Sequence, residues 1–396
     1  MVNCQTIISA LALSALAAPA AAAAVGPGLN PGKRFTLDLV PVKRGPAHPA
    51  ARYVDTLDRY GGRASDRLRS VANPKTGSTS VTPHANNTQY HIPVKLGNSN
   101  MTLRFDTGSA NLWVTINETI GRGSHRPFDN STCKRYPGYT FDASWRPLGE
   151  ILGDVCEDKV TIGGITAEKQ AIQLALHMSQ EISEHLKDDG NIGFAFTGAN
   201  SILPDPQKPW FENVKNDLQD AVFVVDLRRG GPGSIDFGFV DPKYTSRVFW
   251  AYVDSGSGFW KFIADGYMIG QGSGFGDWFS GILDTGNDLI LLPQEFVKHY
   301  YKHVPDAFFD EGQGGYIFPC NTTLPAWTVI IEYGLFTVPG NEINVGPVGN
   351  GSCYGGIQGN GGLPYGIFGN LFFGQVIIIF ESKDGHPPMV GFATKA

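Results

Sequence analysis

The tripeptide Asp-Thr-Gly occurs twice in this chain of 396 residues, each time after one apolar segment and before another. The first copy lies in Phe105–Val114 and the second in Leu283–Leu292, so Asp106 and Asp284 stand 178 positions apart (284 − 106). At this composition, chance would produce the tripeptide only about 0.2 times. The repeat therefore predicts two similar lobes, each presenting one aspartate on a tight turn at the end of a strand.

Two aspartates within hydrogen-bond distance of each other share one proton, because both cannot stay ionised. The ionised carboxylate can take a proton from water, and the protonated one can donate to a carbonyl oxygen. Such a pair can hydrate an amide carbonyl with no metal and no covalent intermediate. We interpret Asp106 and Asp284 as this pair, with Ser109 able to hydrogen-bond the outer oxygen of Asp106. No metal and no cofactor is expected.

The rest of the pattern is typical of a mainly β chain. Apolar residues alternate with others in 90–96 and in 101–105, as in strands with one buried face. Further strands are predicted at 160–162, 221–226, 329–331 and 376–380. Glycine supplies 50 of the 396 residues, which favours tight turns between short strands. Helices are expected at 210–218 and 295–303, and residues 51–68 form an amphipathic stretch.

The N-terminus is typical of a signal peptide covering residues 1–24. These residues carry no charge, and a short apolar run from Ile7 to Ala18 is followed by alanine-rich sequence. We expect a secreted protein, with vacuolar delivery as the alternative. No later segment is predicted to span a membrane, and the C-terminus has no hydrophobic tail, so no membrane anchor is expected in the mature form. We also expect a monomer.

Charge divides the exported chain into two parts. Residues 25–76 contain ten lysines and arginines against four aspartates, a net charge of +6, while the whole chain carries −6. Residues 77–396 therefore carry −12, because residues 1–24 are uncharged. So acidic a body excludes nucleic acid as a partner, since phosphate binding needs a basic face. The basic segment is expected to lie on this acidic body at neutral pH.

Four cysteines remain outside the signal peptide, and an even number in an exported chain indicates two disulfides. Proximity in sequence favours Cys133–Cys156 and Cys320–Cys353, although three connectivities are formally possible. Asn-X-Ser/Thr sequons, which are candidate glycosylation sites, occur at Asn86, Asn100, Asn117, Asn130, Asn321 and Asn350.

From about Gln89 to Ala396 the chain resembles the pepsin-family aspartic endopeptidases, most closely the fungal penicillopepsin-like group. The first Asp-Thr-Gly segment matches the family's first active-site motif almost residue for residue. Other segments with the family pattern are Gly153–Gly164, Ile235–Phe239, Gly258–Phe262, Gly355–Asn360, Ile367–Gly369 and Val390–Ala393. Cys320 and Cys353 stand where that group has a disulfide in its C-terminal lobe.

The resemblance implies a bilobal pepsin-like fold, with two pseudo-symmetric β lobes, a cleft between them and a hairpin flap over the cleft. Residues 77–245 would form the N-terminal lobe and 246–396 the C-terminal lobe. The basic segment 25–76 would be a pro-segment, with its end between 75 and 89. The implied activity is hydrolysis of peptide or protein substrates at acidic pH, by water activated between the two aspartates. The partners would be the substrate and the chain's own pro-segment.

Four positions depart from the family pattern. An ungapped match places Trp145-Arg146-Pro147-Leu148-Gly149 where the family's flap has tyrosine and glycines. Asn287 stands where the second motif has threonine or serine, and Asn370 where the family has aspartate. Asn191-Ile192 precedes Gly193 in place of two hydrophobic residues. Because Pro147 has no N–H to offer a substrate, the flap predicts weak general proteolysis and a narrow substrate range.

Several alternatives stay open at this level. Trp113 could be an ordinary core residue or could lie under the flap near Trp145. Asn287 could hydrogen-bond Asp284 through its amide or simply satisfy a turn. The departures also permit a divergent, pseudoprotease-like member that binds a peptide or other ligand in the cleft, or does other acid/base chemistry there.

Overall fold

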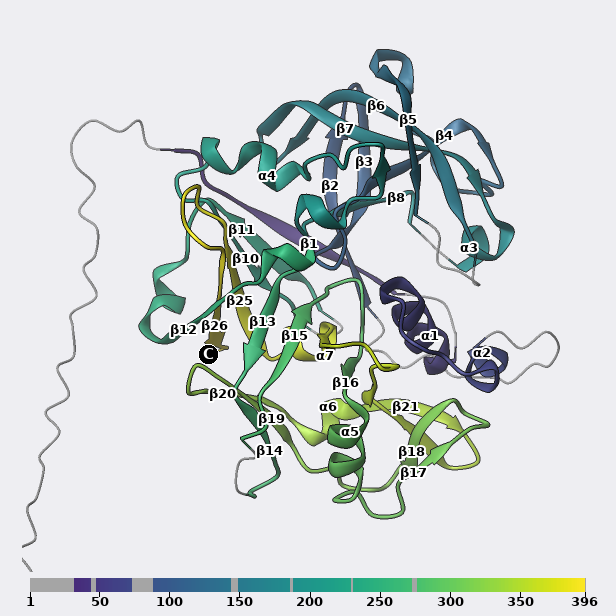
Figure 1. The fold of residues 1–396 in the computed structure, drawn as a ribbon, viewed down its shortest axis with the longest axis vertical. Helices are drawn as coiled ribbons and strands as arrows, with labels where there is room; N and C mark the ends of the chain where they lie inside the picture. Colours follow the sequence, from purple (N-terminus) through teal and green to yellow (C-terminus); the bar gives the residue numbers. More distant parts are fainter. Residues whose placement is uncertain are drawn as a thin grey trace, which may run out of the picture. The chain divides into compact units, whose positions relative to one another are not determined.

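The computed structural model describes residues 32–43, 48–72, 88–143, 149–185, 188–228, 231–272 and 276–395. The chain divides into two units, Met1–Pro31 and Gly32–Ala396, and all the described residues belong to the second. Strands occupy far more of these residues than helices do, which confirms the predicted mainly β class (Figure 1).

The largest sheet has fourteen strands, in the order β12-β26-β25-β10-β11-β1-β2-β3-β8-β4-β7-β6-β5-β9. Its strands are β1 (Phe35–Lys43), β2 (Thr88–Leu96), β3 (Ser99–Asp106), β4 (Leu112–Ile120), β5 (Lys134–Asp142), β6 (Ile151–Ile162), β7 (Ile165–Met178), β8 (Gly190–Gly193), β9 (Ile202–Leu203), β10 (Val222–Asp226), β11 (Gly233–Phe237), β12 (Val248–Tyr252), β25 (Val376–Glu381) and β26 (Met389–Thr394).

Three smaller sheets come from the later part of the chain. Five strands form the order β13 (Lys261–Ala264), β15 (Phe279–Leu283), β24 (Gly366–Phe368), β16 (Ile290–Leu292) and β23 (Ile357–Gly359). The other two sheets are β14 (Gly266–Ile269), β19 (Trp327–Ile331) and β20 (Gly334–Val338), and β17 (Phe308–Asp310), β18 (Gly315–Pro319), β22 (Ser352–Gly355) and β21 (Asn344–Gly349).

The sequence repeat corresponds to a repeated strand arrangement. In the first copy, β8 pairs in parallel with β3 and antiparallel with β4. In the second copy, β24 pairs in parallel with β15 and antiparallel with β16. Each Asp-Thr-Gly turn thus joins two strands that flank a third, and the duplicated motif lies at equivalent places in two similar β units.

The helices are short and few among the described residues. They are α1 (Pro49–Tyr60), α2 (Asp66–Ala72), α3 (Gln180–His185), α4 (Trp210–Val214), α5 (Gln294–Tyr301), α6 (Gly340–Ile343) and α7 (Asn370–Phe373). The helix predicted at 210–218 is shorter, because a 3-10 turn replaces it from Lys215 to Asp217. None of the helices in the described ranges has the length and apolar character to cross a membrane.

The amphipathic stretch of the basic segment forms two helices instead of one. Pro49 opens α1, where a missing N–H costs nothing, and His48 Nδ1 accepts the N–H of Ala50. The helix ends at Gly61, which adopts a left-handed conformation (φ 70°) that glycine tolerates best. The apolar face of α1, which includes Val54 and Leu57, belongs to one buried apolar cluster with residues of β15, β16 and β24.

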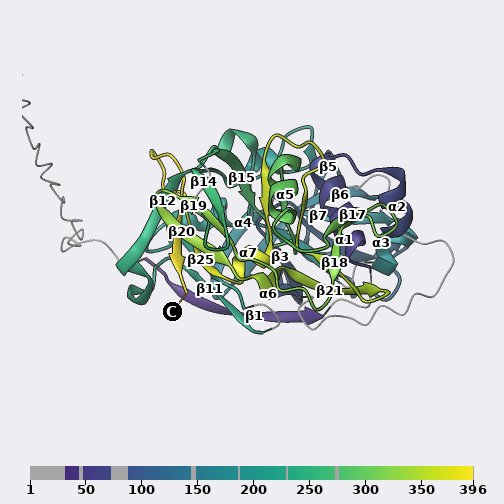
Figure 2. The same ribbon diagram turned by 90° about the horizontal axis from the view of Figure 1, so that it is seen from below.

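Strand β1 places another part of the basic segment inside the large sheet. It pairs antiparallel with β11 from Phe35 to Leu39 and with β2 from Val40 to Lys43. The strand lies beside β11 in both views (Figure 1 and Figure 2). The basic segment is therefore held by both a strand and a helix.

Both predicted disulfides are present, Cys133–Cys156 and Cys320–Cys353. The first joins the residue before β5 to β6, so it closes the base of the β5–β6 hairpin. Of the predicted glycosylation sites, Asn86 lies outside the described residues. The other five are exposed or half-buried, and their modification stays a prediction.

Removing the hairpin disulfide should lower the free energy of unfolding. The bridge spans a sequence separation of 23 residues. Closing a loop of this size is worth about 3 kcal/mol in the chain-entropy model. We expect C133S/C156S to lose roughly this amount in urea denaturation of the precursor, and mass mapping of the parent protein to find both thiols bonded. Equal stability of the parent and the double variant would contradict the prediction.

Candidate active site

Asp106 and Asp284 face each other across two glycine turns. Their side chains are 1% and 0% exposed. Gly108 donates its N–H to Asp106 Oδ1 at 3.0 Å, and Gly286 donates to Asp284 Oδ1 at 2.8 Å. A Cβ on Gly286 would lie 2.8 Å from Asp106 Oδ1, and one on Gly108 would overlap Asp284 Oδ1. Glycine is therefore required at both positions, because each turn lies against the opposite carboxylate.

The threonines of the two motifs lock the turns together. The N–H of Thr107 donates to Thr285 Oγ1 at 3.0 Å, and the N–H of Thr285 donates to Thr107 Oγ1 at 3.1 Å. Each hydroxyl then donates across to the other unit, Thr107 to the carbonyl of Leu283 and Thr285 to that of Phe105. All four bonds are buried, so the backbone itself fixes how the two carboxylates lie relative to each other.

Arg59 of α1 bridges both carboxylates. Its Nη1 lies 3.3 Å from both oxygens of Asp106, and 3.2 Å and 3.4 Å from the two oxygens of Asp284. One nitrogen of the guanidinium thus contacts all four carboxylate oxygens. A water molecule poised between the carboxylates would have to occupy the same space.

The neighbouring Tyr60 closes the site from the same helix. Its hydroxyl donates to the carbonyl of Gly108 at 3.1 Å. Its ring packs edge-on against Phe259 and Tyr365. Arg59 and Tyr60 are therefore anchored in the cleft by an apolar wall as well as by charge.

Asp106 has a polar surround that extends into the strand behind it. Ser109 Oγ donates to Asp106 Oδ2 at 2.8 Å. Arg104, two residues earlier on β3 and almost fully buried, places Nη2 3.7 Å from the same oxygen. Asn191 connects these two groups, since its Oδ1 accepts from Arg104 Nε at 2.9 Å and its Nδ2 donates to Ser109 Oγ at 3.1 Å. The departure at position 191 thus supports a buried polar network beside Asp106.

The network continues to a second buried carboxylate. Asp188 lies 3.9 Å from Arg104 Nη1 and 2.5 Å from His91 Nε2. Arg104 therefore stands between two acids, Asp106 on the cleft side and Asp188 behind it.

The two members of the pair have pKa values shifted in opposite directions. Burial would raise the pKa of Asp106, but the guanidiniums of Arg59 and Arg104, with the hydrogen bonds of Ser109 and Gly108, hold it below its ordinary value. Burial raises the pKa of Asp284 to about 6, because the lowering effect of Arg59 does not cancel it and the charge of Asp106 adds to it. With Arg59 in place, a proton taken up by the pair is therefore favoured on Asp284 over Asp106.

Asn287 and Asn370 both hydrogen-bond the second turn. Asn287 Oδ1 accepts from the N–H of Leu289, and its Nδ2 donates to the carbonyl of that residue. Asn287 Oδ1 also accepts from Thr56 of α1 at 2.9 Å. Asn370 Nδ2 donates at 3.1 Å to the carbonyl of Thr285 and to Asp288 Oδ1. Of the two alternatives for Asn287, these bonds favour the turn role.

Trp113 is a buried core residue, and its predicted place under the flap near Trp145 stays a prediction. It is 2% exposed and packs with Phe141 and Ala143 of the β5 region and Ile151 of β6, and it lines the small cavity beside Asp106. Trp145, Arg146 and Pro147 lie outside the described residues, so the predictions about the flap tip stay predictions.

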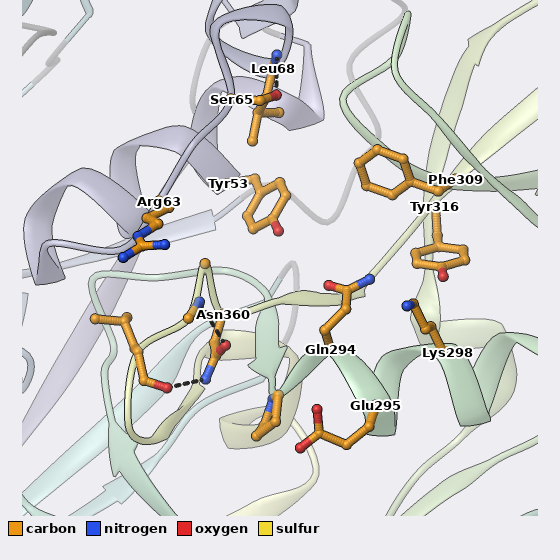
Figure 3. Close-up of a pocket in the computed structure, with 14 residues that line it drawn as sticks. Tyr53, Arg63, Ser65, Leu68, Gln294, Glu295, Lys298, Phe309, Tyr316 and Asn360 are labelled. Atoms are coloured by element: carbon orange, nitrogen blue, oxygen red, sulfur yellow. Dashed lines mark hydrogen bonds between the residues drawn. The ribbon is translucent and has the colours of Figure 1, made fainter.

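Two cavities border α1. The one beside Asp106 has a volume of about 180 Å³, and Arg59, Tyr60 and Arg104 are among its lining residues. A larger cavity of about 780 Å³ contains neither aspartate (Figure 3). It lies between Tyr53 of α1 and side chains of α5 such as Gln294. Both spaces have walls from the basic segment, so its departure would enlarge both.

Sequence reasoning missed Arg59, Tyr60 and Arg104 as members of the site. A general signal existed, since the basic segment contains an amphipathic stretch and is expected to lie on the acidic body, but it does not single out Arg59. Arg104 also stood out as the one charged residue within the apolar strand that leads to Asp106.

The fold and the paired turns define a class of protein, and comparison with known proteins identifies the same class. The model of the eukaryotic aspartyl protease family matches residues 89–395, and the chain belongs to this family. It is accordingly an aspartic-type endopeptidase, as the duplicated motif predicts.

Individual relatives extend over the whole chain. Penicillopepsin-1 of Talaromyces stipitatus is 40% identical over 398 residues, covering 100% of both chains. Aspergillopepsin-1 of Aspergillus fumigatus is 38% identical over 381 residues, covering 93% of this chain and 95% of that protein. The crystal structure of an aspartic proteinase from Irpex lacteus aligns with a TM-score of 0.63 at 20% identity, over 78% of this chain and 94% of the other. That likeness confirms the bilobal pepsin-like fold.

Proposed function

We propose that the chain is the inhibited precursor of a secreted aspartic endopeptidase, in which Asp106 and Asp284 activate the hydrolytic water. The strongest support is the contact of Arg59 Nη1 with all four carboxylate oxygens of the pair. A carboxylate pair built for hydrolysis is here covered by a cation from the chain's own basic segment.

We assign the two roles from the groups that stay in the site when Arg59 has left, because Ser109 and Arg104 lie beside Asp106 and favour its ionised form. Ionised Asp106 takes a proton from water while the resulting hydroxide adds to the peptide carbonyl. Protonated Asp284 donates its proton to the carbonyl oxygen, which gives a neutral tetrahedral diol. Asp106 then passes its proton to the leaving nitrogen, Asp284 recovers a proton from the diol, and the C–N bond breaks. The pair ends with one proton, as it began.

Inhibition and acid activation follow from the same contacts. Arg59 lowers the pKa of both aspartates, so protonation of either one opposes its binding. The attraction is full above the pKa values of the uncovered pair. It weakens as the pH falls below them and is lost once the pH lies below the lower pKa values that the aspartates have with Arg59 in place. Acid should therefore release the basic segment, with the chain then cut between residues 75 and 89.

We also propose how the chain is exported and how it is divided. Residues 1–24 would direct export, residues 25–76 would be the pro-segment, and 77–245 and 246–396 would be the two lobes. Secretion is tested by N-terminal sequencing of the protein recovered outside the cells that produce it. Recovery from vacuoles alone would favour the vacuolar alternative.

Hydrolysis itself is tested on a denatured protein substrate. We expect the acid-treated chain to cleave it and pepstatin to stop the cleavage. A folded, processed sample that binds peptide without cutting it would favour the pseudoprotease alternative.

The position of the acid limb in the pH profile of kcat/KM should depend on Arg104. Asp106 is faced by Arg59 and Tyr60 of α1, by Arg104, by Asp284 and, across the small cavity, by Asp142 of β5. Once the basic segment has left, Arg104 is the guanidinium that still favours the ionised form of Asp106. We expect R104M in the activated enzyme to raise the pKa of Asp106 and move the acid limb of kcat/KM to higher pH. R104K should retain the limb, and a lowered rate with an unmoved limb would indicate a merely structural role.

A further inference from the structure

Three residues of helix α1 contact three different residues of the second active-site turn. Arg59 lies on Asp284, Thr56 donates to Asn287 at 2.9 Å, and Arg52 Nη1 lies 2.5 Å from Asp288 Oδ2. Positions 52, 56 and 59 share one face of a helix. The helix therefore covers the cleft from Asp284 to Asp288, and Arg52 and Arg59 lie about 10 Å apart along its axis.

The carboxylate of Asp288 is positioned to bind a cation. Asn370 Nδ2 donates to its Oδ1 at 3.1 Å, while its Oδ2 receives Arg52. The side chain of Asp288 is 13% exposed and that of Arg52 is 5% exposed, so the ion pair is largely shielded from water. Asn370 supplies a neutral donor at this place, where the family's aspartate would set a second carboxylate beside the first.

We propose that Asp288 selects a lysine or arginine side chain in the substrate, and that Arg52 occupies this subsite in the precursor. The proposal rests on the proposed function, since it needs the basic segment to leave and a peptide to take its place. Asp288 remains in the mature chain, four residues after Asp284, when Arg52 departs.

The spacing gives the approximate substrate position. A bound peptide must pass the aspartate pair and, in an extended conformation, rises about 3.3 Å per residue. A distance of about 10 Å therefore corresponds to about three residues from the scissile bond. A basic side chain there would replace the guanidinium of Arg52 in a site that is already shaped for it. Such charge-assisted bonds in sheltered sites change kcat/KM by roughly 10- to 100-fold.

The test uses full-length precursor activated in acid and pairs of peptides that differ at one position. One peptide of each pair has arginine and the other has citrulline, which has nearly the same shape but no charge. The position is moved through four residues on each side of the scissile bond. We expect one position, about three residues from that bond, where the arginine peptide has a kcat/KM at least tenfold higher.

The ratio of kcat/KM for the arginine peptide to that for the citrulline peptide is then measured for three variants. D288N should bring the ratio close to one, D288E should restore part of it, and D384N, which alters an acid on the turn between β25 and β26, should leave it as in the parent. Thermal melting checks that each variant is folded. A ratio near one at every position in the parent, or an unchanged ratio in D288N, would overturn the proposal.

Failure of the proposed function would look different. In that case neither peptide of any pair would be cut. Equilibrium binding of the same two peptides with a reduced, uncleavable bond would then decide the role of Asp288. Tighter binding of the arginine peptide to the parent but not to D288N would support the subsite, and equal binding would overturn it.

Discussion

Replacing either aspartate of the pair by asparagine should lower kcat by about 10⁴-fold, because proton transfer by a positioned acid and base contributes up to that amount. D106N loses the base that deprotonates water, and D284N loses the acid that protonates the carbonyl. Neither change should unfold the chain, since the crossed threonine bonds that fix the two turns use no aspartate oxygen. The measurement is the initial rate of peptide cleavage after the basic segment has been removed by another protease.

S109A is the matched control for this pair. It removes the hydrogen bond to Asp106 Oδ2 but leaves both carboxylates in place, so the loss should be about tenfold. Substantial residual cleavage by purified D106N or D284N would refute the assignment of the pair.

Replacing Arg59 by glutamine should release the precursor from inhibition. Breaking a buried ion pair by removing one partner costs about 3–5 kcal/mol, which corresponds to 10²-fold or more in the equilibrium between covered and open cleft. We expect R59Q precursor to bind a tight active-site inhibitor before any cleavage, at a pH where the parent precursor binds none. Titration with that inhibitor over time measures the open fraction.

R63Q is the control for a change of charge in the same segment. Arg63 follows α1, and its side chain is exposed. Its N–H bonds the carbonyl of Gly361, which glutamine leaves unchanged. Equal inhibitor binding by R59Q and R63Q would show that Arg59 has no special role in closing the site.

Much of the architecture could be predicted because it depends on short-range patterns. The duplicated Asp-Thr-Gly indicated two equivalent turns, and the structure shows the same strand pairing around both. Proximity in sequence sufficed for the disulfides. Alternation located β2 and β3, where one buried face gives a clear period of two.

The missed part of the site depends on contacts between distant segments. Nothing in the sequence of α1 shows that Arg59 meets the aspartates while Arg63 does not. The direction of the helix in the cleft decides this, and it follows from the apolar face that includes Val54 and Leu57. Arg104 breaks the apolar pattern of its strand, and only the folded positions of Asn191 and Asp188 explain how a buried guanidinium is accommodated.

Acid activation of the full-length precursor tests the central claim most directly. The precursor is brought from neutral pH to about pH 4, close to the ordinary pKa of aspartate. The mass of the chain and the rate of peptide cleavage are then followed in the same sample. The account predicts that cleavage activity appears as the N-terminus moves to a residue between 75 and 89, and that D106N shows neither change. A chain that loses its basic segment in acid, stays folded and still cuts no peptide would contradict it.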